Sequence, residues 1–338
     1  MHEVLDRALD NLWDYGWLPT DVYETVRRTE DERALSFVVD AIAHNTSRYP
    51  SLHPRWTEQL AEIDATIWWD PSEPHLAQWA LKHIELPDDA VAVVVALLAS
   101  LATLPALPVI VPRPGSPLAE VTHHHVAPKI LKRVRSLLAK AESTPFPDEA
   151  EALSAKAQEL VTRHALERMP SEVPTTISRR VWLDKRYFDG KAQVVHVVAD
   201  ANRCRAVVYD LGFVALVGEE LDLEIVELLS ASLLVQATRA MVAAGDKARK
   251  GDESRSPAFR KSFLLAYAHR VGERLKAANT PPDDDRLLPV LAARKRAVDE
   301  LFSTLFTNTT SRSSAIRSAA GWDAGRAAAD RADLDVDR

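Results

Sequence analysis

The sequence predicts a mainly α-helical protein with a small α+β part: a helical N-terminal unit, an αα-hairpin, and a C-terminal β-hairpin packed with long helices. Along most of the chain, apolar residues recur every three or four positions, which is the period of one helix face. Residues 206–209 and 213–217 are instead short β-branched and aromatic runs that flank a Gly-containing turn, a pattern typical of a β-hairpin. The composition, 46% hydrophobic and 27% charged, is that of a globular protein and argues against a disordered chain.

A proline-rich segment gives the predicted domain division. Residues 105–128 contain repeated prolines and few periodic positions, which indicates a semi-rigid linker. A chain of 338 residues also exceeds one ordinary domain. We therefore expect four segments, which are a helical N-terminal domain at 1–112, a Pro-rich linker at 113–127, a helical hairpin at 128–170, and an α+β domain at 176–338.

Short helices are predicted for the N-terminal domain. Apolar residues between Val4 and Trp13 follow helical spacing, and residues 21–28 and 33–43 continue the pattern. Large aromatic residues are dense here: Trp13, Tyr15, Trp17, Trp56, Trp68, Trp69 and Trp79. We expect them to form a core of rings whose N–H groups find partners, and a ligand-stacking site is the alternative.

The most apolar run of the chain raises the question of a membrane. Residues 90–104 form an uninterrupted run of 15 residues, whereas a helix needs about 20 to span a bilayer. Asp88 and Asp89 suit the first turn of a buried helix, so no membrane partner is expected. The N-terminus carries acids in place of an apolar signal segment, and the lone Cys204 cannot form an intramolecular disulfide. A cytoplasmic protein is therefore expected.

The predicted hairpin contains two matching apolar stripes. The first helix carries Ile130, Val134, Leu137, Leu138 and Ala141, and the second carries Ala150, Leu153, Ala157, Leu160 and Val161. Pro145 and Pro147 separate the two helices, because proline cannot continue a helix. Beyond the hairpin, helices are predicted at 191–202, 222–242, 259–278 and 291–306.

A family resemblance lies in this hairpin. Residues 137–144 read LLAKAEST, Phe146-Pro147 follows, and residues 149–160 read EAEALSAKAQEL. This pattern resembles the domain-of-unknown-function 2786 family (DUF2786) of bacteria and phages. Other segments, among them VADANRCRAVV and LLSASLLVQA, resemble companion segments of actinobacterial members, so the resemblance extends over nearly the full length. It implies a related fold and a cytosolic bacterial setting, but an uncharacterised family supplies no activity, cofactor or catalytic residue.

Motifs of the common catalytic folds are not found in the sequence. The phosphate-binding glycine loops, the GxSxG elbow, HExxH and an EF-hand loop are all missing, and we expect neither a cofactor nor a metal. Histidines 123–125 and aspartates 283–285 are expected to be solvated. The catalytic candidates are Cys204, His196 and Asp200, because a thiol beside a base and between two arginines can be activated. The other interpretation of Cys204 is small buried filler.

Basic residues supply the leading functional hypothesis. Residues 1–127 contain 8 Lys and Arg against 19 Asp and Glu, whereas the remainder contains 34 against 30. Helical spacing puts Lys129, Arg133 and Lys140 on one face. Residues 239–276 add 10 cations against 4 acids. The expected nucleic-acid-binding residues are Lys129, Lys132, Arg133, Lys140, Arg260 and Lys261.

Three classes of function follow from these patterns. The leading one is a non-enzymatic binding protein that engages nucleic acid or a nucleoprotein partner through its basic C-terminal half. The second is a hydrolase-type enzyme that uses Cys204 or histidines such as His164 and His269. The third is a protein–protein adaptor whose acidic N-terminal domain binds a protein partner.

Overall fold

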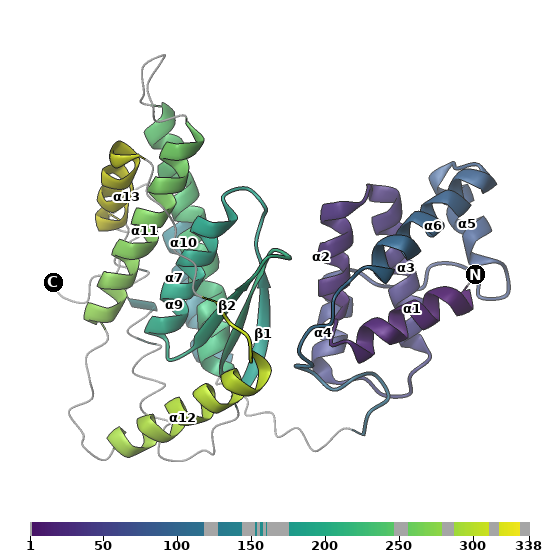
Figure 1. Ribbon diagram of the computed structural model, residues 1–338, viewed down its shortest axis with the longest axis horizontal. Coiled ribbons are helices and arrows are strands. Elements are labelled where there is room, and N and C mark those ends of the chain that lie inside the picture. Colours follow the sequence, from purple (N-terminus) through teal and green to yellow (C-terminus); the bar gives the residue numbers. More distant parts are fainter. Residues whose placement is uncertain are drawn as a thin grey trace. The chain divides into compact units, whose positions relative to one another are not determined.

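A computed structural model describes residues 2–117, 128–143, 153, 156, 157, 160, 176–246, 256–278, 287–310 and 318–331 (Figure 1). Contacts divide the chain into two compact units, Met1–His123 and His124–Arg338. In the described part, helices dominate and one small antiparallel sheet is present, which confirms the predicted fold class.

Helices are the only regular secondary structure in the described part of the first unit. Its helices are α1 (His2–Asp14), α2 (Pro19–Thr29), α3 (Glu32–Ser47), α4 (Pro54–Glu62), α5 (His75–His83) and α6 (Pro87–Ala102). Three of them begin at a proline, whose missing N–H costs nothing in the first turn. Helix α3 instead has an N-cap, since the Asp31 carboxylate accepts a hydrogen bond from the Ala34 N–H at 3.0 Å.

Tryptophan rings form the core of this unit: Trp13, Trp17, Trp56, Trp69 and Trp79 are buried, whereas Tyr15 and Trp68, which were also expected in the core, are exposed. Trp17, Trp56 and Trp79 are almost fully buried. The indole N–H of Trp17 donates to the Pro105 carbonyl at 2.8 Å, and that of Trp56 donates to the Pro112 carbonyl at 3.0 Å. Because these partners lie in the Pro-rich segment, the same hydrogen bonds hold that segment against the helices.

The described part of the Pro-rich segment packs on the first unit. Leu107 and Val111 are buried, and the Leu107 N–H donates to the Tyr15 carbonyl at 2.8 Å. Gly16 has a φ of 78°, and a Cβ there would clash with the Leu107 carbonyl oxygen. Residues 105–117 therefore form part of the N-terminal unit.

The second unit combines long helices with a sheet. Its elements are α7 (Pro128–Ser143), β1 (Thr176–Trp182), α9 (Phe188–Ala201), β2 (Arg205–Tyr209), β3 (Phe213–Glu219), α10 (Glu220–Asp246), α11 (Pro257–Ala278), α12 (Leu287–Leu305) and α13 (Ala319–Arg331). The strand order is β1-β3-β2. The predicted hairpin is β2–β3, in antiparallel register from Arg205↔Val217 to Tyr209↔Phe213, and Gly212 adopts the positive φ of its turn.

Strand β1 was not predicted. It pairs with β3 along its whole length, from Thr176↔Glu219 to Trp182↔Phe213. Its residues Ser178 and Arg179 are polar yet buried, so the strand lacks the alternation by which a half-buried strand is recognised. Arg179 is tolerated because its guanidinium lies 3.1 Å from the Glu227 carboxylate of α10.

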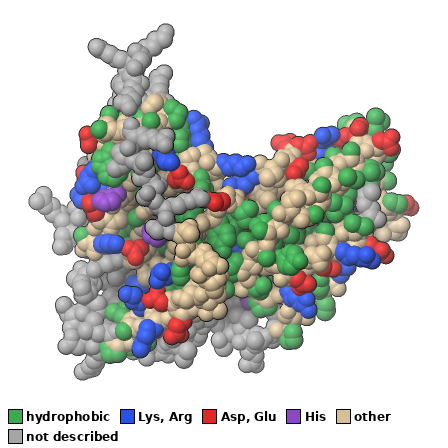
Figure 2. Space-filling view, viewed as in Figure 1, with side chains coloured by type: hydrophobic (Ala, Val, Ile, Leu, Met, Phe, Trp, Pro, Cys, Tyr) green, Lys and Arg blue, Asp and Glu red, His purple; other side chains and the backbone are tan. Residues whose placement is uncertain are grey.

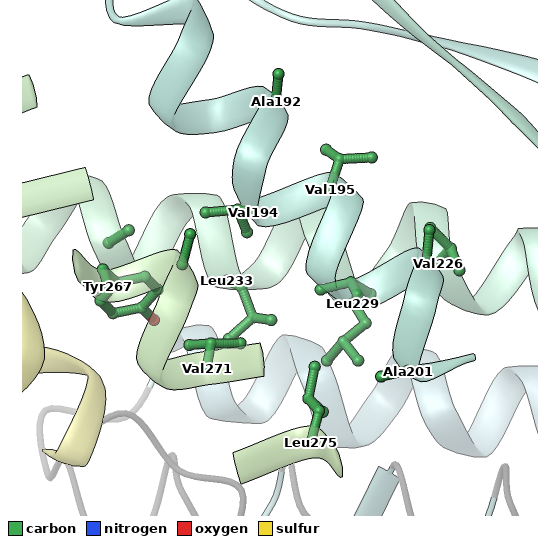
Figure 3. Packing of buried hydrophobic residues seen from close by; sticks show 14 of the residues in the cluster. Ala192, Val194, Val195, Ala201, Val226, Leu229, Leu233, Tyr267, Val271 and Leu275 are labelled. Carbon is green, nitrogen blue, oxygen red and sulfur yellow. The ribbon is translucent and has the colours of Figure 1, made fainter. Parts of the chain in front are cut away.

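Three helices enclose the core of the second unit (Figure 3). Val194 and Val195 of α9, Leu229 and Leu233 of α10, and Leu275 of α11 are all buried there. Helix α13 packs on the outer side of α11. Its glycines allow this close approach, because a Cβ on either one would clash with a backbone carbonyl of α11.

Helix α10 contains the one described stretch, Glu220–Ala244, that is long and apolar enough to cross a membrane by length and composition. The core helix of a folded domain has the same composition, and α10 contributes Leu223, Val226, Leu229 and Leu233 to the buried cluster. Helix α6, which raised the membrane question in the sequence, has 16 residues.

Helix α7 is anchored in this same core. Val134 and Leu138 are buried in it, and the helix packs against α10. Ala157 belongs to the same cluster, and Leu160 packs against it. Of the second predicted hairpin helix, residues 153, 156, 157 and 160 are described, and all four are helical.

Candidate nucleic-acid interface

Helix α7 has two faces of opposite character. Between Lys132 and Lys140, the buried residues are Val134 and Leu138, and Leu137 is partly buried. The exposed residues of that stretch are Lys132, Arg133, Arg135, Ser136, Ala139 and Lys140. The solvent face of this stretch therefore carries four cations and no acid. The apolar inner face fixes the helix on the core and holds these cations outward.

The cations of α7 differ in their surroundings. Lys132 and Arg133 make no ion pair with any residue that the structure describes. Arg135 is close enough to Glu224 of α10 to affect its ionisation: burial raises the pKa of Glu224, and the charges of Arg179 and Arg135 oppose that rise. The side chain of Lys129 lies outside the described residues. Lys132 and Arg133 are thus the cations of this face for which the absence of a described ion-pair partner is established.

The predicted binding residues of α11 are engaged within the molecule. The Lys261 ammonium lies 2.7 Å from the Asp189 carboxylate at the start of α9. Arg260 hydrogen-bonds to the hydroxyl of Tyr187. Burial acts to raise the pKa of Tyr187, but the hydrogen bonds from Arg260 and Arg186 outweigh it, and the pKa is lowered.

Cations further along α11 are also paired. Lys276 lies 2.7 Å from the Asp200 carboxylate, and Arg270 contacts Glu273 at 2.8 Å. Arg270 also pairs with Asp330 of α13. The positive charge that the sequence shows along α11 is therefore largely neutralised by acids from α9, α11 and α13. Lys132 and Arg133 of α7, in contrast, have no acidic partner among the described residues.

Helix α7, which presents Lys132 and Arg133 to solvent, lies in the segment that carries the sequence resemblance. Residues 129–168 match the family described as protein of unknown function (DUF2786). The predicted resemblance of the hairpin is thereby confirmed, and the resemblance beyond the DUF2786 segment stays a prediction. No curated protein and no solved structure matches the chain. The DUF2786 match carries no activity with it, so the function has to be argued from the site.

The catalytic candidate Cys204 is buried, with 4% of its surface exposed. Burial raises the pKa of its thiol well above the ordinary value, and the nearby Asp222 carboxylate raises it further, against the opposing charge of Arg203. The thiol donates a hydrogen bond to the Asn202 carbonyl at 3.3 Å. A thiol must ionise to act as a nucleophile, and this environment favours the neutral form.

The other two catalytic candidates do not share the buried environment of the Cys204 thiol. His196 and Asp200 are both exposed on α9. Asp200 is paired with Lys276. The structure therefore does not gather a buried thiol, a histidine and a carboxylate into one site, and the hydrolase hypothesis gains no geometric support from these three residues.

One buried histidine–carboxylate pair was not predicted from the sequence. In the first unit, His75 Nε2 lies 2.9 Å from Asp40 Oδ2, and both residues are buried. The Trp68 N–H donates to both oxygens of Asp40 at 2.9 Å, and Trp69 packs on the His75 ring with centroids 4.1 Å apart. These hydrogen bonds satisfy a buried carboxylate, so the pair links α3 to α5. No sequence signal connects residues 35 positions apart.

The remaining candidates add no metal site. Among the residues that the structure describes, no three His, Cys, Asp or Glu side chains are grouped to hold a metal ion. His269 is exposed, and its Nδ1 lies 3.2 Å from the carboxylate of Glu273, four residues later in the same helix. Residues 123–125, 164 and 283–285 lie outside the described part of the chain.

Proposed function

We propose that this protein binds nucleic acid, alone or in a nucleoprotein partner, through the exposed cationic face of α7. The observation that supports this is the solvent face of residues 132–140, which contains four cations and no acid. A row of cations on a helix surface matches the repeating negative charge of a phosphate backbone.

The mode of binding follows from the residue types. Lysine and arginine on an exposed helix neutralise phosphates and release condensed counterions, and this contribution does not depend on base sequence. The described part of this face offers no Asn, Gln or aromatic side chain for base recognition. We therefore expect weak binding that has little sequence preference and falls steeply with salt.

The rigid mounting of the helix also favours this function. Val134 and Leu138 are 2% and 3% exposed, so α7 is held on the core. A charge presented from a fixed helix loses less conformational entropy on binding than the same charge on a loose segment. The cationic face is thus available without a prior rearrangement.

Titration of the full-length protein with a labelled DNA duplex and a labelled single strand, across a salt series, tests the proposal. The Lys132→Glu/Arg133→Glu variant should bind either probe more weakly, and the slope of log K against log salt should fall by about one unit per lost contact. Both side chains are exposed, so the melting temperature should stay nearly unchanged.

A matched control is available on α12. Lys295 and Arg296 are also adjacent, exposed cations of the second unit, so Lys295→Glu/Arg296→Glu makes the same change in net charge. It should retain most of the binding. The proposal fails if neither probe is bound at low salt, or if the α7 variant binds as well as the parent.

A further inference from the structure

The solvent face of α6 is apolar, which is unusual for a surface helix. Its exposed residues after the first turn are Val91, Ala92, Val95, Ala96, Ala99 and Ala102. None is polar, although the outer face of a surface helix normally carries charged or polar side chains. The apolar run in the sequence predicts a buried helix here. The structure buries one side, with Val94 and Leu97, and leaves the other in solvent.

The neighbouring helix extends this apolar surface. Helix α5 packs against α6, and its Leu81 and Ile84 are 80% and 94% exposed. Leu86, in the loop between the two helices, is 69% exposed. Figure 2 shows hydrophobic side chains gathered over the part of the first unit that carries α5 and α6. Single exposed apolar residues are ordinary, but a group of this kind marks an interaction surface.

Ile84 is held in an unfavourable backbone conformation. It ends α5 with φ 58° and ψ 42°, the left-handed region, where glycine or asparagine is the usual residue. A β-branched residue is a rare occupant of this region. Its side chain gains almost no burial in return. A contact with something outside this chain would explain why isoleucine is placed there.

The charges beside this surface are mainly acidic. Asp88 and Asp89 are exposed at the start of α6, and Glu85 precedes them. Glu85 lies 3.5 Å from Arg33 of α3, which brings the acidic start of α3, with Asp31 and Glu32, to the same end. Figure 2 shows acidic side chains at the edge of the hydrophobic region. At this end of the surface there are thus five acids against two cations, Arg33 and Lys82.

We propose that the exposed apolar surface of α5 and α6 (Leu81, Ile84, Leu86, Val91 and Val95) is a docking site for an amphipathic helix of a protein partner that carries lysine and arginine beside its apolar face. Apolar anchors would supply the contact area, and the acidic rim would select a basic partner and orient it. The rim also argues against the other occupants. Two copies of this surface would bring like charges together, and anionic lipid would be repelled.

The experiment uses the full-length protein and a labelled peptide with leucine at helical positions i, i+3, i+4 and i+7 and lysine elsewhere. The lysine peptide should bind, and the same peptide with glutamate in place of lysine should bind at least about tenfold more weakly. The Leu81→Ser/Val95→Ser variant should lose about tenfold in affinity for the lysine peptide without a drop in melting temperature.

Two further variants distinguish the surface from general stickiness. Val208→Ser/Val242→Ser removes exposed valines from the second unit and should bind the lysine peptide as the parent does. Ile84→Asn suits the left-handed conformation, so it should keep or raise the melting temperature and still weaken peptide binding.

The proposal is overturned if the lysine and glutamate peptides bind equally, or if the α5–α6 variant and the control variant behave alike. Sedimentation of the parent as a dimer that Leu81→Ser/Val95→Ser converts to a monomer would show that a second copy covers the surface. Flotation with neutral phosphatidylcholine vesicles, lost in the same variant, would show that lipid does.

Discussion

Helices α7 and α11 are both rich in Lys and Arg, yet the structure gives their charges different roles. On α11, Lys261 and Lys276 each lie 2.7 Å from a carboxylate of α9. On α7, Lys132 and Arg133 have no ion-pair partner among the described residues. Both helices contribute buried residues to the same core. The difference between them is the presence or absence of acidic residues near their outer surfaces.

The comparison shows why counting charges along a chain overstates the surface available to an anionic partner. Residues 239–276 hold 10 cations against 4 acids, the larger local excess. In the described part of this segment, three acids that are distant in sequence, Asp189, Asp200 and Asp330, pair with cations of α11. On the shorter cationic run of α7, Lys132 and Arg133 have no such partner among the described residues.

The largest expected effect concerns the inner face of α7. Leu138 is 3% exposed in the core, so Leu138→Asp would bury a carboxylate without a partner. We expect a loss of more than about 3 kcal/mol in the free energy of unfolding, measured by urea denaturation. Ser136→Asp, two residues away on the exposed face, adds the same charge and is the control, so it should change stability little. Parent-like unfolding of Leu138→Asp would show that α7 does not pack on the core.

A smaller effect is expected where α11 meets α13, and it should depend on pH. The hydrogen bond from Arg270 lowers the pKa of Glu273 below its ordinary value of 4.5, and the charges of Arg326 and His269 act in the same direction. A lowered folded-state pKa adds stability that is complete above the unfolded pKa and is lost as pH falls through the folded pKa.

Glu273→Gln should therefore be less stable than the parent at pH 7, by under about 1 kcal/mol because the pair is largely exposed. The difference should shrink as the pH falls below 4.5. Thermal melts of both proteins between pH 7 and pH 3 measure it. A difference that stays constant over this range would assign the effect to packing of the side chain and not to its charge.

The sequence was sufficient for the parts of the fold that depend on local periodicity. The stripe containing Val134 and Leu138 predicts both the helix and its buried face, and the turn at Gly212 predicts the β2–β3 hairpin. Strand β1 was missed because Arg179 is buried by partners on α10, which lie about 45 positions later in the chain. Periodicity records which residues are apolar, and it does not record which polar residues find partners.

For the same reason, the sequence predicted the exposed cations of α7 but not the ion pairs of α11. Helical spacing correctly places Arg133 and Lys140 on the exposed side of α7. It gives no sign that Lys261 pairs with Asp189, 72 positions away. The sequence did not predict the exposed apolar surface of α5 and α6 either, because a run of valine and alanine has the same composition whether one face or both are buried.

The most direct test of the central claim compares matched charge reversals on the two helices. Lys132→Glu/Arg133→Glu on α7 and Lys261→Glu/Lys276→Glu on α11 change the net charge equally. For binding of a labelled DNA duplex by the full-length protein, the α7 variant should lower the slope of log K against log salt by about two units. The α11 variant should leave the slope within about half a unit of the parent, because its cations are already paired. Equal losses of slope in both variants would contradict the claim that α7 carries the interface.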